Sequence, residues 1–264
     1  MTPSEALTER NSIHGKTIAV WFSCGAASAV AAKKTLDLYR DTSNVIIFNN
    51  PIEEEDEDNQ RFLKDVEKWL GHPITHARSE KYPSQSCVEV WDHRKFMSGP
   101  AGAPCTLLLK KKVRERIERE VKIDWHVLGF TLEEKKRHER FSLLERENTL
   151  PILIDAGITK AMCYKIIQDA GLTLPRVYSM GYPNANCIGC VKATSPTYWN
   201  HVRKVHPEVF KQREEQSRRI GARLARYKGK RVFLDELPPD AKGRAMKNMD
   251  IECGIFCAWE KEAK

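Results

Sequence analysis

The segment 17–40 constrains the fold of this 264-residue chain more than any other. It begins with an uncharged, apolar run at 17–22, as expected of a strand that is covered on both faces. Small residues follow at 23–28, Ser-Cys-Gly-Ala-Ala-Ser, and an amphipathic helix begins directly behind them. Such a turn lets backbone N–H groups approach an anion closely at the positive end of a helix. The segment predicts a phosphate-binding loop, although an ordinary tight turn between a strand and a helix has the same composition.

The rest of the first half alternates between apolar strand patterns and amphipathic helix patterns. Strands are predicted at 44–49, 72–77 and 124–130, and helices at 59–70, 85–96, 105–121 and 132–146. This alternation indicates an α/β fold, a mostly parallel twisted sheet with helices on both faces. Ligands in such sheets bind at the carboxyl ends of the strands, so the segments 23–28, 49–54 and 129–140 should converge.

An acidic run at 53–58 lies between the second strand and the next helix. Carboxylates in this position stabilise the start of a helix, and a subset of them could instead hold Mg²⁺ beside a nucleotide.

The second half of the chain changes in character. It contains a predicted helix at 159–171, an irregular segment at 175–186 and a long basic helix at 207–227. We therefore expect a tail at 1–15, a nucleotide-binding α/β domain at 16–178 and an α-rich, cysteine-bearing region at 179–264.

Charge and composition narrow the class of ligand. The net charge of +8 suits a polyanion, either a nucleotide or a nucleic acid. No apolar run approaches the roughly 20 residues of a membrane span, and the polar first residues do not form a signal peptide. Eight cysteines without a secretion signal indicate a reducing compartment, which predicts a cytoplasmic protein that uses cysteine for metal binding or redox chemistry.

The cysteines fall into pairs and single residues. Cys187 and Cys190 form a C-x-x-C motif whose spacing lets two thiolates face one metal, and Cys253 and Cys257 form a second close pair. Together the pairs could bind zinc or an iron–sulfur cluster. Another zinc set would use Cys187, Cys190, His201 and His206, although the gap at 191–200 is shorter than in zinc fingers. Cys87 and Cys163 are predicted to be core residues.

Blocks in order along the chain resemble the adenosine phosphosulfate and phosphoadenosine phosphosulfate (PAPS) reductases and their PP-loop relatives. The blocks are Phe22–Ser28 (their SGGxDS loop), Asn49–Glu53 (D-T-G-x-E), Cys105 with Leu109–Val113 (Cys…LKV), Gly129–Arg140 (G-[IV]-R-x-x-E-S…R), Gly181-Tyr182 with Cys187 and Cys190 (GY…C-x-x-C), and Glu252–Ile255 (ECG[IL]H). The likeness covers roughly residues 16–257.

The resemblance implies an adenine nucleotide on the loop and a [4Fe–4S] cluster, with zinc as the alternative metal. The implied nucleotide-binding residues are Ser23, Cys24, Gly25, Ala26, Ser28, Asn49, Lys110, Gly129, Arg137 and Arg140. The implied metal ligands are Cys105, Cys187, Cys190 and Cys257.

The chain also departs from the family pattern. Ala27 replaces the loop Asp, which weakens any prediction of ATP activation through Mg²⁺. Cys24 replaces the second glycine of the loop and Phe256 replaces the His after ECGI. Cluster-bearing reductases carry paired cysteines where this chain has Pro104-Cys105, so one ligand is absent and Cys257 is the predicted substitute.

The resemblance leaves three hypotheses about function. The first is a sulfonucleotide reductase in which the Cys253 thiolate attacks sulfur and a thioredoxin-like dithiol releases sulfite. The second is a sulfur-transfer enzyme that contacts DNA or RNA through the basic segments 105–121 and 207–230. The third is a non-catalytic nucleotide-binding protein with structural zinc. Cys253 could serve as nucleophile or as metal ligand, and the choice of function depends on it.

Overall fold

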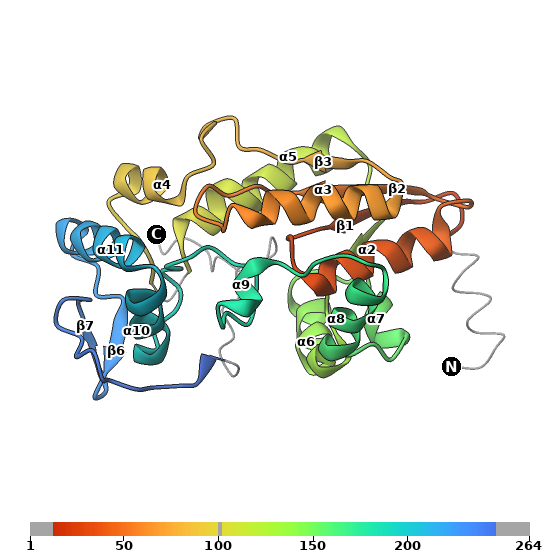
Figure 1. Ribbon diagram of the computed structural model, residues 1–264. Coiled ribbons are helices and arrows are strands. Elements are labelled where there is room, and N and C mark those ends of the chain that lie inside the picture. Colours follow the sequence, from red (N-terminus) through yellow and green to blue (C-terminus); the bar gives the residue numbers. More distant parts are fainter. Residues whose placement is uncertain (1–12, 100–101, 247–264) are drawn as a thin grey trace. The chain divides into compact units, whose positions relative to one another are not determined.

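The computed structural model describes residues 13–99 and 102–246 (Figure 1). They form two compact units. The first comprises the described residues up to Asn50, Asp58–Ala77 and Arg116–Pro175; the second comprises Pro51–Glu57, Arg78–Glu115 and the described residues from Arg176. This division differs from the predicted boundary after residue 178, because two earlier segments bury their apolar side chains with the cysteine-bearing region.

The first unit is built on a five-stranded parallel sheet with the order β3-β2-β1-β4-β5. The strands are β1 (Thr17–Trp21), β2 (Asn44–Asn49), β3 (Ile74–His76), β4 (Trp125–Val127) and β5 (Thr149–Leu150). Strand β1 is central, with Ile18 opposite Val45 on one side and Trp125 on the other. Ile18 and Ala19 are fully buried, which explains why this strand carries no charge. The sheet confirms the predicted α/β fold class.

Helices surround this sheet. They are α2 (Ala26–Tyr39), α3 (Asp58–Leu70), a short 3₁₀ turn (Leu132–Glu134), α6 (Lys135–Leu144), α7 (Ile152–Asp155) and α8 (Lys160–Asp169). Helix α2 packs against β1 as well as α7 and α8, so both its alanine-rich start and its middle are buried. The helix that follows β1 is thereby fixed with its N-terminus at the carboxyl end of the central strand (Figure 1).

The second unit is mainly helical. It contains α4 (Cys87–Arg94), a π-helical segment (Thr106–Lys111), α9 (Arg176–Ser179), α10 (Pro196–Val205) and α11 (Pro207–Ile220). The π-helical segment continues into α5 (Lys112–Glu120), which belongs to the second unit up to Glu115 and to the first unit from Arg116. Its core contains the buried side chains of Trp91, Tyr198 and Trp199 together with several cysteines.

The predicted helix at 207–227 is too long. Helix α11 ends at Ile220, and Gly221 follows with φ of 83°, a left-handed conformation that stops helices. Residues Ala225–Tyr227 form strand β6, which pairs in antiparallel fashion with β7 (Lys230–Val232). Lys228 and Gly229 both have positive φ, as a two-residue hairpin turn requires. Gly221 and Gly229 therefore end the helix and form the turn in a segment whose composition otherwise favours one helix.

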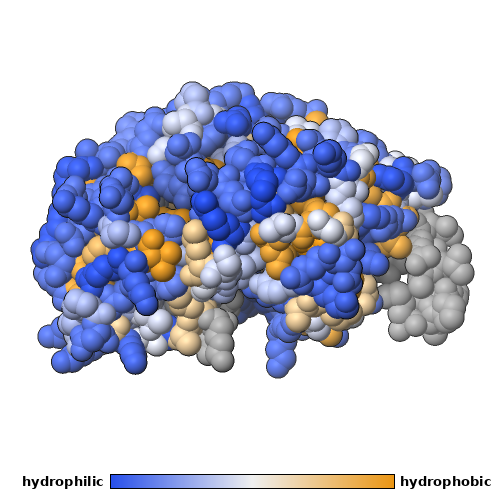
Figure 2. Space-filling view, viewed as in Figure 1, coloured by the Kyte–Doolittle hydropathy of each residue, from blue (hydrophilic) through white to orange (hydrophobic). Residues whose placement is uncertain are grey.

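The described surface is predominantly hydrophilic on the face drawn in Figure 2. Among the described residues, none of the helices combines the length and apolar character needed to cross a membrane.

Candidate functional site

The loop between β1 and α2 is held in shape by its own hydrogen bonds. The backbone N–H of Ser23 donates to Ser28 Oγ at 3.1 Å, and Ser28 Oγ donates to the Gly25 carbonyl at 2.9 Å. Gly25 is the N-cap of α2, and no side chain caps the helix at this position. The Ser28 hydroxyl therefore organises the loop from within, while the first turn of α2 carries the partial positive charge of a helix N-terminus.

Cys24 adopts a backbone conformation that favours glycine. Its φ is 55°, in the left-handed region that side chains other than Gly, Asn and Asp seldom adopt. Its side chain is 1% exposed and lies 3.4 Å from Asn49 Nδ2. The family pattern has glycine here, and this geometry gives the physical reason: the loop needs the turn, and Cys24 contributes its backbone while its thiol is directed into the protein.

Asn49 and Gly129 lie against the same loop. Asn49 ends β2, and its Nδ2 donates to the Phe22 carbonyl at 2.9 Å. A Cβ on Gly129 would lie 2.7 Å from the Ser28 nitrogen and 2.9 Å from the Ala27 carbonyl carbon, so the backbone after β4 touches the start of α2. The structure thus brings together the carboxyl ends of β1, β2 and β4, as the sheet topology predicts.

The three cationic residues predicted to bind the nucleotide lie on α6 and in the π-helical segment. Arg137 donates to Glu134 Oε1 at 2.6 Å and lies 5.4 Å from the Phe130 ring centroid. Arg140 is exposed on α6. Lys110 belongs to the second unit, in the π-helical segment.

In the second unit, Cys87 shares one buried core with Cys105, Cys187 and Cys190. The exposed fractions of these four residues are 3%, 7%, 7% and 5%. Interaction with Cys105 and then with Cys187, together with burial, raises the pKa of Cys87 well above its usual value. Cys87 is buried as predicted, but its neighbours are two of the predicted metal ligands, which sequence reasoning missed. Only its position directly after the capping residue Ser86 marks it out in the sequence.

Glu54 links the two segments that carry Cys87 and Cys187. Its carboxylate accepts hydrogen bonds from Ser86 Oγ at 2.6 Å, from the Cys87 N–H at 2.7 Å and from the Val88 N–H at 3.1 Å, and so caps α4. The Glu54 carbonyl accepts a hydrogen bond from the Ile188 N–H at 2.9 Å, inside the C-x-x-C motif.

The C-x-x-C motif folds into a tight turn. Gly189 has φ of 69°, and a Cβ there would meet Val209 Cγ1 at 3.0 Å, so both conformation and space favour glycine. The buried Tyr198 hydroxyl accepts a hydrogen bond from the Cys190 N–H at 2.8 Å. This turn holds Cys187 and Cys190 in fixed positions.

Within the described ranges, no three His, Cys, Asp or Glu side chains are grouped around one position as a single bound metal ion requires. His201 and His206, the alternative zinc ligands, lie against Tyr182, with ring centroids 4.7 and 5.8 Å from its ring. The zinc-finger arrangement with the C-x-x-C motif is therefore absent from the part of the chain that the structure describes. Cys253 and Cys257 lie outside the described residues.

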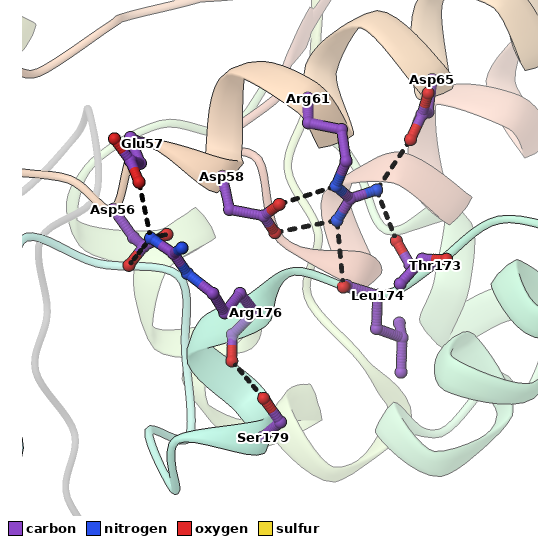
Figure 3. A network of polar contacts seen from close by, with 9 residues as sticks. All are labelled: Asp56, Glu57, Asp58, Arg61, Asp65, Thr173, Leu174, Arg176 and Ser179. Atoms are coloured by element: carbon purple, nitrogen blue, oxygen red, sulfur yellow. Dashed lines mark hydrogen bonds and ion pairs between the residues drawn. The ribbon is translucent and has the colours of Figure 1, made fainter.

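Carboxylates of the acidic run at 53–58 bind Arg61 and Arg176 (Figure 3), and Glu54 binds the start of α4. In the second unit, Arg176 donates to Asp56 at 3.0 Å and to Glu57 at 3.2 Å. In the first unit, Arg61 forms a two-pronged contact with Asp58, at 2.7 and 2.8 Å. The carboxylates stabilise local structure, as predicted, although Glu54 caps α4 rather than the helix that directly follows the run.

Comparisons with known proteins give structural matches only. No protein-family model matches the sequence, and no curated protein matches it. One solved structure is a PAPS reductase from Candida auris in complex with phosphate, with a TM-score of 0.47 and 12% identity, covering 71% of this chain and 88% of that one. Another is the U34-tRNA thiolase NcsA from Methanococcus maripaludis with its [4Fe–4S] cluster, with a TM-score of 0.44 and 14% identity, covering 83% of this chain and 79% of that one. No residue role is carried over from either structure.

Proposed function

We propose that this protein binds an adenine nucleotide at the loop between β1 and α2 and reduces a sulfonucleotide to sulfite. The observation that carries the proposal is the geometry of the loop. Small residues at 23–28, a helix start without a side-chain cap, and Gly129 pressed against the Ala27–Ser28 backbone leave N–H groups as the chemistry that the loop offers. Backbone N–H groups at a helix N-terminus bind phosphate without a metal.

The absence of a carboxylate in the loop favours a sulfonucleotide over ATP. Ala27 occupies the position of the family's Asp, so the loop provides no oxygen ligand for Mg²⁺ at that residue. Sulfonucleotide reduction needs the phosphosulfate to be bound and oriented, and its phosphate is already a good leaving group. A loop that binds phosphate through backbone N–H groups is sufficient for that reaction.

Cys253 is the proposed nucleophile, outside the described residues. Its thiolate would attack the sulfur of the phosphosulfate; the S–O bond to the phosphate would break, and the nucleotide phosphate would leave with the bonding electrons. The product is an S-sulfocysteine. A thioredoxin-like dithiol then attacks the Cys253 sulfur, sulfite leaves, and oxidation of the dithiol to a disulfide supplies the two electrons.

The cysteine set fits a [4Fe–4S] cluster by its chemistry. Four buried cysteines from one unit provide soft thiolate donors, which iron–sulfur clusters require. When bound, such a cluster would supply a charged, redox-active centre and would fasten together the segments that hold it.

The nucleic-acid hypothesis receives less support from the basic helix at 207–220. Arg213 is 2% exposed and lies 4.8 Å from the Trp91 ring, Arg218 pairs with Asp235 and Glu236, and Arg219 pairs with Asp92. Cations that are already neutralised gain less from a phosphate backbone. These arginines stabilise the second unit.

Calorimetry with PAPS, adenosine phosphosulfate and ATP tests the binding site. Gly25 has φ of −100° and ψ of 154°, which valine adopts readily, so Gly25→Val adds bulk without backbone strain. We expect it to cost several kcal/mol of affinity, since charge-assisted hydrogen bonds each contribute about 1.5–3 kcal/mol. Unchanged binding of all three nucleotides would refute the site.

Sulfite release from PAPS and adenosine phosphosulfate, with thioredoxin as reductant, tests the reaction. Cys253→Ser should abolish release while the nucleotide still binds. Tight binding of a tRNA or DNA duplex by a protein that releases no sulfite would instead favour the sulfur-transfer hypothesis.

A further inference from the structure

We propose that Cys87 is the fourth ligand of the iron–sulfur cluster, with Cys105, Cys187 and Cys190. This inference rests on the proposed function insofar as it assumes a cluster. It replaces Cys257, which the sequence predicts as the substitute for the cysteine missing at Pro104.

The first support is that the side chains share one buried core. Cys87, Cys105, Cys187 and Cys190 come from three separate parts of the sequence, and all of them belong to the second unit and to the same core. Cys163, the other cysteine predicted to be a core residue, lies in α8 of the first unit and has no share in this group.

The second support is the scaffold around the thiols. Cys87 is the first residue of α4, and its position is fixed by the N-cap Ser86 and by the Glu54 carboxylate. The same Glu54 accepts a hydrogen bond from Ile188 through its backbone carbonyl, so one residue sets Cys87 and the C-x-x-C turn relative to each other. Tyr198 holds the other end of that turn through Cys190. Ligands that are positioned by the fold in this way need little reorganisation to bind a cluster.

The third support is the way the thiols are arranged. Zinc needs four donors around one point, at about 2.3 Å from the metal, and the described residues hold no group of three donors centred in that way. Cys87 is instead linked to the C-x-x-C turn through Glu54, and Cys105 and Cys190 belong to the same buried core. Each of the four irons of a [4Fe–4S] cluster takes one thiolate, so the ligands surround a volume rather than a point. The four buried thiols therefore suit a cluster better than a single ion.

The decisive experiment compares alanine variants of single cysteines in the full chain. Each protein is purified without oxygen, and iron, acid-labile sulfide and zinc are measured together with the visible absorption spectrum. We expect Cys87→Ala to lose iron and sulfide at least roughly tenfold, since even residues behind metal ligands change metal affinity 10–100-fold. Cys163→Ala, equally buried, is the matched control and should keep the cluster. Cys257→Ala should also keep it.

The outcomes separate the ligand from the function. Full iron content in Cys87→Ala, or its loss in Cys257→Ala alone, overturns the assignment of Cys87 and leaves the cluster in place. Wild-type protein without iron, even after reconstitution with iron and sulfide, overturns the cluster itself. To separate loss of a ligand from loss of folding, the metal-free forms of wild type and Cys87→Ala are compared by circular dichroism and urea denaturation. Equal stability of these metal-free forms supports the ligand role, whereas an unfolded metal-free Cys87→Ala points to a core role and overturns the assignment.

Discussion

The two units carry sites of opposite construction. In the first, the loop between β1 and α2 is made by the backbone of consecutive residues, and Ser28 and Gly129 fix its shape. In the second, buried cysteines from three separate segments share one core, and Glu54 and Tyr198 hold Cys87 and Cys190 in place. The loop needs small residues at given positions, whereas the set of cysteines needs a folded core around it.

This difference determines what damages each site. Added volume should disrupt the loop, because its proposed function depends on backbone that a ligand can approach. Lost anchors should disrupt the set of buried cysteines, because their positions are set by neighbouring residues. The predictions below test this contrast.

The largest effect is expected for Gly129→Val. A Cβ at Gly129 would lie 2.7 Å from the Ser28 nitrogen, a backbone atom that cannot move without shifting α2. Overpacking of this kind should lower the free energy of unfolding by about 3 kcal/mol, and nucleotide binding should be lost with it. Urea denaturation and calorimetry measure the two effects.

Gly171→Ala is the control for Gly129→Val. Gly171 has φ of 77° and open space around the position of a Cβ. Alanine there should cost about 1 kcal/mol through backbone strain alone, with nucleotide affinity unchanged. Equal losses of stability in the two variants would mean that no close approach exists at Gly129.

A smaller effect is expected for Glu54→Ala, on the second site. The substitution removes a carboxylate that accepts hydrogen bonds from Ser86, Cys87 and Val88 at the start of α4. Loss of a cap and of charge-assisted hydrogen bonds should lower the free energy of unfolding by about 2 kcal/mol. Iron content should fall as well, because Cys87 loses its anchor.

The neighbouring Glu53 is the control, since it is exposed. Glu53→Ala should leave both stability and iron content unchanged. If Glu54→Ala keeps its iron, the position of Cys87 does not depend on this carboxylate, and the contrast between the two sites fails.

The same contrast explains how much of each site could be predicted from the sequence. The loop is local: 17–28 specifies a strand, a turn and a helix start, and the convergence of Asn49 and Gly129 follows from parallel strands. The proposed role of Cys87 could not be predicted, because no spacing rule relates it to Cys105 and Cys187. Its place depends on α4 and the π-helical segment sharing a core with α10, which is a matter of tertiary packing.

The fold was predictable to the same degree. The alternation of strands and helices gives the α/β class and the positions of β1 and β2. The composition of 207–227 predicts one helix, but Gly221 and the Lys228-Gly229 turn convert its end into a hairpin. The segments 51–57 and 78–115 belong to the second unit, and nothing in their composition predicts this.

An effect of about 1 kcal/mol is expected for Arg61→Lys in the first unit. The guanidinium bonds Asp58 with two nitrogens, Asp65 with one, and the Thr173 and Leu174 carbonyls, and so fixes the segment after α8 to α3 (Figure 3). Its side chain is 36% exposed, so solvent screening reduces the contribution of the ion pairs. Lysine keeps the charge and loses the fork. Thermal denaturation of Arg61→Lys, with Arg176→Lys as the counterpart in the second unit, measures the cost; no change in Arg61→Lys would show that the fork is dispensable.

The smallest expected effect is a loss of stability at low pH, to which one histidine in each unit contributes. His138 in α6 is 9% exposed and shares a hydrogen bond with Thr149 Oγ1 at 3.0 Å, and burial lowers its pKa. Burial also lowers the pKa of His201 in the second unit. A histidine with a lowered pKa binds its proton more weakly in the folded protein than in the unfolded chain. Below about pH 6.5 the unfolded chain therefore takes up more protons, and stability falls as the pH falls, by at most about 1.4 kcal/mol per pH unit for each histidine.

His138→Gln should reduce the loss of stability at low pH. Glutamine can still bond Thr149 but does not titrate in this range, so the drop in the urea midpoint between about pH 7.5 and pH 5.5 should be smaller than in wild type. His201→Gln should remove a separate share, since the two residues belong to different units and their effects should add. An identical drop in the urea midpoint in wild type and His138→Gln would mean that His138 becomes protonated in the folded protein as easily as in the unfolded chain. The burial of His138 beside Phe130, with ring centroids 5.4 Å apart, argues for the opposite result. A charged imidazole is costly in a buried position, and its Nε2 is bonded to the Thr149 hydroxyl rather than to a carboxylate.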